Sequence, residues 1–258
     1  YRKEIDNNSS PEIFIDPNSF SDDGTVALRG ISFSKDGSLA TYMITEGGSD
    51  WRKIIVIDAE KKSIIEDTLI DVKFSGVSWR GNQGFYYSSY PNPKNTSELS
   101  AKTQLHKLYY HKLGTPQTSD KLIYGGEKQP NRYISGYVTE DQNFLVISAS
   151  KTTSGNQLHI LDLKKEKLVT IHKEYMNRLS VVHNEGNQFF IYTNIESPNG
   201  RVFSVNLNSP KKWNDIIPEK ENVLSASYGG GYLFASYLVD AKTEVEQLDL
   251  KGKLIRNI

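Results

Sequence analysis

The chain has 258 residues, and its 31 Lys and Arg balance its 31 Asp and Glu, so the formal net charge is zero. Because these charges are interspersed and no long apolar run occurs, the sequence lacks the features of a nucleic-acid binder, a membrane-surface binder or a membrane-spanning protein. The absence of Cys fits the cytoplasm and a disulfide-free bacterial periplasm equally well, while 15 Tyr, 10 Phe and 19 Gly favour strands and turns.

The first elements expected in chain order are two short strands, at residues 1–5 and 12–15. A turn-rich segment at residues 6–11 joins them. Pro17 ends the second strand, because proline restricts the residue before it and has no N–H to donate. We interpret residues 1–20 as the outer tail of a preceding blade whose beginning lies outside this chain.

A repeat of about 45 residues follows. Apolar strand starts come directly after turns at Leu39, Phe85, Phe144, Phe189 and Tyr232. A period in this range, with several strands in each unit, is typical of propeller blades. We therefore predict an all-β fold, a β-propeller of four-stranded blades. The full blades are expected at residues 26–71, 72–126, 132–175, 177–220 and 222–258.

Two features stand out in the blade at residues 177–220. Val202–Leu207 alternates between apolar and polar residues, which predicts a strand exposed on one face. Asn199-Gly200 lies just before it and is a hairpin signal, because both residues tolerate positive φ. This blade should therefore contain a tight turn between two of its strands.

A polar insertion occupies residues 91–104. It runs from Pro91 to Gln104 and contains Asn95 and a single leucine, Leu99. The segment is longer than a hairpin needs, and such loops are either functional or disordered. We expect it to be the most mobile part of the chain.

No catalytic constellation is evident from the residues alone. Gly47-Gly48-Ser49-Asp50 does not match the Gly-x-Ser-x-Gly nucleophile turn. Gly229-Gly230-Gly231 lacks the Lys and the following helix of a phosphate loop. The five His are scattered without the spacing of metal ligands, so neither a metal nor a cofactor is expected.

Several longer strings are more specific than the period. They include Ile13-Phe14-Ile15-Asp16-Pro17-Asn18, Asp71-Val72-Lys73-Phe74-Ser75, Phe85-Tyr86-Tyr87-Ser88-Ser89-Tyr90-Pro91 and Ser197-Pro198-Asn199-Gly200-Arg201-Val202. Together, and in this order, they resemble the propeller domain of the prolyl oligopeptidase family across essentially the whole chain.

The resemblance implies a seven-bladed propeller that caps an α/β-hydrolase domain and admits short proline-containing peptides to a Ser-Asp-His triad. The family's Gly-Gly-Ser-x-Gly-Gly string lies in the hydrolase domain and is absent here, so no catalytic residue is carried over. The chain would be the substrate-gating part of a serine endopeptidase that cleaves after proline. With fewer than seven blades, we expect self-association of an open arc or further blades outside this chain.

The resemblance also implies a set of substrate-lining residues. Phe74 matches an aromatic residue of a substrate subsite, Ile134 an apolar residue on the same wall, and Ser150 a position where some relatives carry a peptide-holding Arg. The alternative for Phe74 is a core position, because Val72 and Phe74 would share one strand face. The alternative for Ile134 is packing. The insertion at residues 91–104 matches a mobile loop near the hydrolase interface, which implies gating.

Two other functions stay open at this point. A stand-alone propeller would serve as a protein-interaction scaffold, although strand endings such as Ile57-Asp58 lack the Trp of WD-type repeats. A sugar- or lactone-processing propeller would need acidic or His residues clustered on inner strands, which are mostly apolar or hydroxylic here. A coding sequence that continued past Ile258 into a hydrolase domain would decide between these functions.

Overall fold

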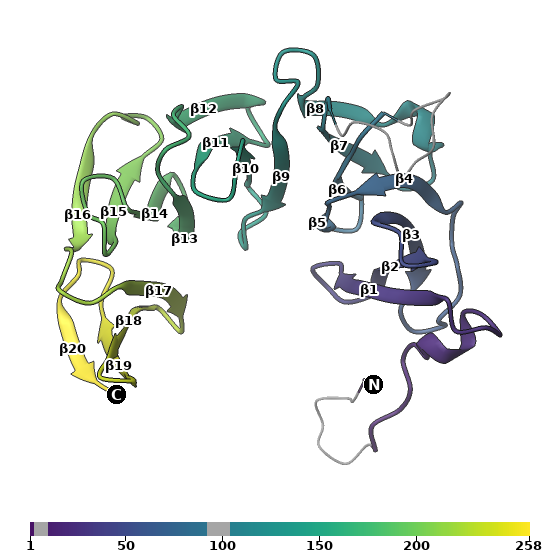
Figure 1. The fold of residues 1–258 in the computed structure, drawn as a ribbon, viewed down its shortest axis with the longest axis horizontal. Helices are drawn as coiled ribbons and strands as arrows, with labels where there is room; N and C mark the ends of the chain where they lie inside the picture. Colours follow the sequence, from purple (N-terminus) through teal and green to yellow (C-terminus); the bar gives the residue numbers. More distant parts are fainter. Residues whose placement is uncertain (3–9, 92–103) are drawn as a thin grey trace. The chain divides into compact units, whose positions relative to one another are not determined.

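The computed structural model describes residues 1–2, 10–91 and 104–258. The chain divides into two compact units, Tyr1–Tyr137 and Val138–Ile258. Within the described residues the regular elements are antiparallel strands and two short 3-10 turns, η1 (Pro17–Ser19) and η2 (Gln117–Ser119) (Figure 1). The all-β prediction is confirmed.

In the first unit, two successive groups of four strands form one eight-stranded sheet. A single pairing, between Val72 and Ser89, joins the groups. The first group is β1 (Val26–Phe33), β2 (Leu39–Glu46), β3 (Trp51–Asp58) and β4 (Leu69–Lys73). The second group is β5 (Ser78–Arg80), β6 (Gly84–Ser89), β7 (Lys107–Lys112) and β8 (Lys121–Gly125).

Three further sheets have four strands each, and consecutive strands are neighbours in all of them. The first is β9 (Tyr133–Val138), β10 (Phe144–Ser150), β11 (Asn156–Asp162) and β12 (Lys167–His172). The next is β13 (Leu179–Glu185), β14 (Gln188–Thr193), β15 (Arg201–Asn206) and β16 (Trp213–Ile217). The last is β17 (Leu224–Gly229), β18 (Tyr232–Val239), β19 (Lys242–Leu248) and β20 (Leu254–Asn257). The repeated four-strand meander agrees with the propeller prediction.

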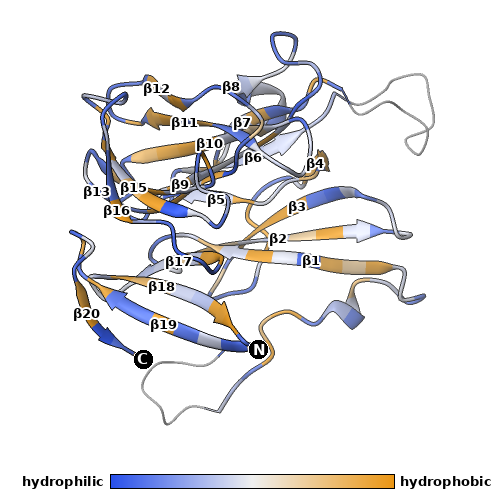
Figure 2. Cartoon of the chain, turned by 60° about the vertical axis from the view of Figure 1, so that its left-hand side comes forward, coloured by the Kyte–Doolittle hydropathy of each residue, from blue (hydrophilic) through white to orange (hydrophobic). Residues whose placement is uncertain are grey.

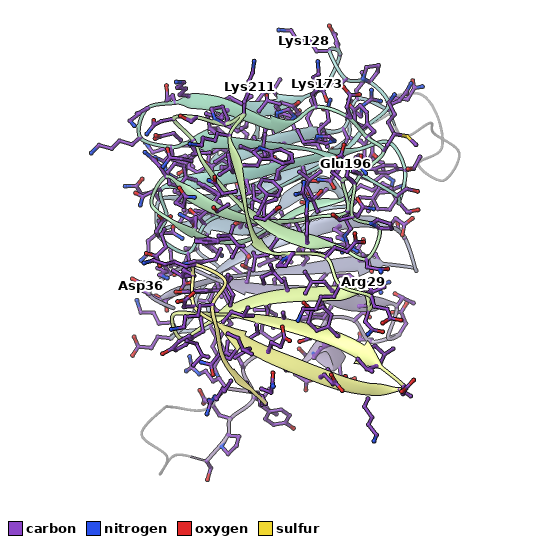
Figure 3. The ribbon with its side chains drawn as sticks, turned by 90° about the vertical axis from the view of Figure 1, so that its left-hand side faces the viewer. Arg29, Asp36, Lys128, Lys173, Glu196 and Lys211 are labelled. Atoms are coloured by element: carbon purple, nitrogen blue, oxygen red, sulfur yellow. The ribbon has the colours of Figure 1, made fainter. Side chains whose placement is uncertain are left out.

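Polar turns set the strand starts, as Asp36 shows in the first unit (labelled in Figure 3). Its carboxylate accepts hydrogen bonds from the Ser38 N–H at 3.0 Å and from Asn82 Nδ2 at 2.7 Å. These bonds, the one from the Ser38 backbone first, hold the pKa of Asp36 well below its ordinary value. The chain reverses here, and β2 begins at Leu39, as expected from the sequence.

The one-sided exposure predicted for Val202–Leu207 is wrong. The four central residues of β15 are all buried. Phe203 packs into a cluster with Phe189, whereas Val202 packs into a different cluster with Leu233. The strand is covered on both faces, so Ser204, which is itself buried, does not mark a solvent face. Figure 2 shows a related contrast, with β10 hydrophobic along much of its length and β19 largely hydrophilic.

The N-terminal tail packs onto the first strand group. Residues 3–9 lie outside the described part of the chain, and Arg2 and Glu12 form an isolated antiparallel bridge. Phe14 is 6% exposed and packs in a cluster with Ile57. Lys62 Nζ donates a hydrogen bond to the Ile13 carbonyl at 2.7 Å. The tail therefore covers apolar surface of the β1–β4 group.

Candidate substrate-lining surface around Phe74

Phe74 lies immediately after β4 and has left the strand. Its φ is +51°, and its side chain is 42% exposed. Val72, two residues earlier, is completely buried in a cluster with Trp79 and Phe85. The two side chains do not share a face, because the left-handed conformation at Phe74 turns the chain out of the sheet. The core alternative for Phe74 is therefore wrong.

Phe74 is the centre of an aromatic surface in the first unit. Its ring meets the ring of Tyr90 at 6.2 Å and 83°, and that of Tyr133 at 6.0 Å and 65°, both edge to face. The Lys73 ammonium lies 5.3 Å from the Phe74 centroid and 5.1 Å from that of Trp51. Because Tyr133 is also 47% exposed, the surface presents two aromatic rings to a ligand, above the buried side chain of Lys73.

Ile134 follows Tyr133 on β9, but its side chain is 1% exposed. The residue contributes through its backbone: the Ile134 N–H donates to Nδ1 of His106 at 2.8 Å. Peptide contact by the Ile134 side chain stays a prediction, and the exposed residue beside it on this strand is Tyr133.

His106 connects the backbone beside Phe74 with that of Ile134, a role that the sequence does not indicate. Its Nε2 lies 3.1 Å from the Lys73 carbonyl, and its ring stacks on Tyr90 with 4.3 Å between centroids. Burial lowers the pKa of His106 to about 4, although the bond to Lys73 opposes this. No signal marks this histidine in the sequence, because its partners lie far along the chain on both sides.

Ser150 lies in the second unit, as the last residue of β10 opposite Asn156 of β11. The Asn156 side chain ties this hairpin end to β13: it accepts from the Leu179 N–H at 3.1 Å and donates to the Leu179 carbonyl at 3.1 Å. A serine hydroxyl offers a peptide one donor, whereas an arginine offers five. The peptide-binding role of Ser150 stays a prediction.

The predicted gating insertion is described only at its two ends. Pro91 and Gln104 are exposed, whereas Asn95 and Leu99 lie outside the described residues. The described residues next to the insertion are well anchored: Leu105 N–H donates to the Pro130 carbonyl at 2.8 Å, and Tyr90 stacks on His106.

A second buried histidine, His111 on β7, lies among carboxylates. Burial lowers the pKa of His111, but Asp120 and Glu66 outweigh this effect and raise the pKa to about 9. Glu66 also accepts from the Gly114 N–H at 3.0 Å. Since both ring nitrogens face carboxylates, His111 has no nitrogen left to activate a nucleophile.

The described ranges contain no group of three or more His, Cys, Asp and Glu side chains that could hold a metal ion. In the same ranges, no helix is long and apolar enough to cross a membrane.

Comparison with known proteins gives one consistent result. Residues 1–258 match the family profile described as prolyl oligopeptidase, N-terminal beta-propeller domain. The prolyl endopeptidase of Elizabethkingia miricola is 49% identical over 261 residues, which cover 100% of this chain and 37% of that protein. Prolyl oligopeptidase A of Galerina marginata is 31% identical, over 92% of this chain and 36% of that protein. The chain thus spans well under half the length of these curated relatives.

Solved structures agree with the fold. One structure comes from a study of two prolyl endopeptidases and the role of inter-domain dynamics in catalysis and specificity. It matches this chain with a TM-score of 0.86 at 28% identity, and the match covers 96% of this chain and 35% of that one. Prolyl oligopeptidase B from Galerina marginata, bound to a 35mer hydrolysis and macrocyclization substrate, matches with a TM-score of 0.87 at 23% identity, over 96% of this chain and 37% of that one. The second likeness concerns the fold alone.

Proposed function

The chain belongs to the prolyl oligopeptidase family, and on this premise we propose that it is the substrate-gating propeller of a serine endopeptidase that cleaves short peptides after proline. The observation that carries the proposal is the exposure of Phe74 at the centre of an aromatic surface. An apolar ring that is held outside the core, and flanked by a second exposed ring on Tyr133, is suited to contacting a peptide side chain.

The cleavage itself is assigned to residues outside this chain. A serine peptidase needs an activated nucleophile, a base and an oxyanion hole together. The two buried histidines of the first unit, His106 and His111, use both ring nitrogens in other contacts. Because the chain spans 37% of the relative from E. miricola, we assign the triad to an α/β-hydrolase domain in the remaining length, and this domain is the propeller's partner.

The propeller residues are assigned to selection rather than to chemistry. Phe74 and Tyr133 would contact the part of a peptide beyond the proline, with Ile134 supporting them from the interior and Ser150 offering a weak polar contact. The insertion at residues 91–104 is proposed to gate entry. Its polar composition with a single leucine and its place between β6 and β7 support this role.

The proposal is tested by comparing the chain alone with the full-length protein from the same coding sequence. Each is incubated with a fluorophosphonate probe and with a chromogenic proline peptide. We expect labelling and turnover with the full-length protein and neither with the chain alone. Turnover by the chain alone, or a coding sequence without a hydrolase domain, would contradict the proposal; the second result would favour an interaction scaffold.

A further inference from the structure

We propose that His106 is a positioning residue of the substrate-lining surface, which sets the two exposed aromatic residues Phe74 and Tyr133 through their adjoining peptide planes. The inference rests on the proposed function of Phe74 and adds a residue that does not itself contact the peptide. His106 is 1% exposed, so any effect that it has on a substrate must act through its neighbours.

The first contact fixes the backbone that leads into Phe74. Nε2 of His106 lies 3.1 Å from the carbonyl oxygen of Lys73, and this carbonyl belongs to the peptide plane between Lys73 and Phe74. The conformation at Phe74, with φ of +51°, is uncommon for a bulky residue and persists only where its surroundings hold it. The bond from His106 acts directly on the plane that defines this angle.

The second contact fixes the backbone after Tyr133. The Ile134 N–H, which donates to Nδ1 of His106 at 2.8 Å, belongs to the peptide plane between Tyr133 and Ile134. Since Nδ1 accepts this bond, the hydrogen of the neutral ring is on Nε2, where it is donated to the Lys73 carbonyl. One tautomer therefore satisfies both contacts, and burial keeps the ring neutral by lowering the pKa of His106 to about 4.

The ring itself is held in place from two further directions. It stacks on Tyr90 with 4.3 Å between centroids and 24° between planes, and Tyr90 in turn meets Phe74 edge to face. The backbone of His106 is tightly enclosed as well: a Cβ added to Gly125 would lie 2.4 Å from the His106 carbonyl oxygen. A displacement of the ring at position 106 would therefore also displace Phe74 and Tyr133.

Three substitutions separate these contacts in the full-length protein. His106→Phe keeps a ring on Tyr90 and removes both hydrogen bonds. His106→Asn places an acceptor near the Nδ1 position and His106→Gln a donor near the Nε2 position, so each can retain one bond. His159→Phe is the control, because His159 is also buried, at 5% exposure, and its Nδ1 contacts Thr170 in the second unit.

The readout is kcat and KM for two substrates, a minimal prolyl substrate and an internally quenched peptide extended on the N-terminal side of the proline. For His106→Phe we expect KM of the extended peptide to rise about fivefold with kcat nearly unchanged, since loss of positioning weakens ground-state and transition-state binding alike. The KM of the minimal substrate should change by less than about twofold, and the His106→Asn and His106→Gln variants should have intermediate KM values for the extended peptide. His159→Phe should leave the ratio of the KM values for the two substrates unchanged.

Phe74→Ala distinguishes the inference from the proposed function. If Phe74→Ala impairs the extended peptide and His106→Phe alters both substrates equally, the positioning role is overturned and the proposed function stands. If Phe74→Ala changes the KM of the two substrates equally, the positioning role and the proposed function are both contradicted.

A measurement on the wild-type protein covers the case in which the variants do not fold. In full-length protein with 15N-labelled histidine, we expect the ring of His106, assigned through its contact with Tyr90, to carry its hydrogen on Nε2 and to stay neutral between about pH 5.5 and 8. If this ring carries its hydrogen on Nδ1 or becomes protonated in that range, the proposed geometry is wrong.

Discussion

Nδ1 of His111 lies 2.7 Å from Oδ1 of Asp120, and both side chains are 2% exposed. Nε2 lies 3.1 Å from Oε1 of Glu66 on the opposite side of the ring. The second oxygen of Asp120 accepts from the Tyr87 hydroxyl at 2.7 Å. A neutral imidazole donates from one nitrogen only, so two carboxylate contacts favour the charged ring. A buried, charged histidine on β7 thus contacts Asp120, which directly precedes β8, and Glu66, which precedes β4.

The stability of the protein should depend on pH through His111. Its pKa is raised from 6.5 to about 9 in the folded protein. The folded state therefore binds a proton that the unfolded state releases, so this stabilisation is present below about pH 6.5 and is lost as the pH rises through about 9. We expect the free energy of unfolding in urea to fall across this window at constant ionic strength. The His111→Phe variant should lack this slope, and an equal slope in both proteins would contradict the assignment.

Removing one carboxylate of this cluster should be costly. Asp120→Asn keeps the shape of the side chain but leaves the His111 charge with one carboxylate partner. Breaking a buried charged pair typically costs about 3 kcal/mol. Asp215→Asn is the matched control, because Asp215 is 57% exposed in its pair with Arg201 and such pairs contribute less than about 1 kcal/mol. Chemical denaturation should show a larger loss in the free energy of unfolding for Asp120→Asn than for Asp215→Asn. Similar losses in the two variants would argue against a special role for the cluster.

The features of the fold that could be predicted from the sequence are those with local causes. Leu39, Phe144 and Tyr232 begin strands as expected, because each follows a polar or glycine-rich turn that reverses the chain. The burial of β15 could not be predicted in the same way. Its alternation of apolar and polar residues is local, whereas the neighbours that cover its second face come from strands farther along the chain.

The site was predicted less completely, for the same physical reason. Phe74 was identified by resemblance, but nothing in its identity indicates a positive φ, which the surrounding contacts impose. The sequence shows His106 and His111 only as scattered residues. Ile134 and Lys73 lie 28 and 33 positions from His106, and Glu66 lies 45 positions from His111, so only the folded chain brings these residues together.

The positive φ at Phe74 predicts that glycine is more stable than alanine at this position. Alanine normally stabilises an exposed strand position relative to glycine by about 0.5–1 kcal/mol. At Phe74 the φ of +51° reverses the order, because the left-handed region costs a residue with a Cβ roughly 1–2 kcal/mol. We expect Phe74→Gly to be more stable to urea than Phe74→Ala. Phe33 on β1, which is 47% exposed, provides the control pair, and there alanine should be the more stable residue.

The sequence predicts a tight Asn199-Gly200 turn between β14 and β15, but the connection spans residues 194–200 and Asn199 lacks the positive φ of a two-residue turn. Gly200, the last residue of this connection, can be tested by substitution. Its φ is +89°, and an added Cβ would lie 2.4 Å from Cε2 of Tyr192. Gly186 is the matched control, because it has φ of +52° and nothing within 4 Å of an added Cβ. Gly186→Ala should therefore cost only the conformational term, about 1 kcal/mol. Gly200→Ala adds displacement of the Tyr192 ring, for a total of about 2–3 kcal/mol. Urea denaturation of the two variants measures the difference, and equal losses would show that the Tyr192 ring moves aside at no cost.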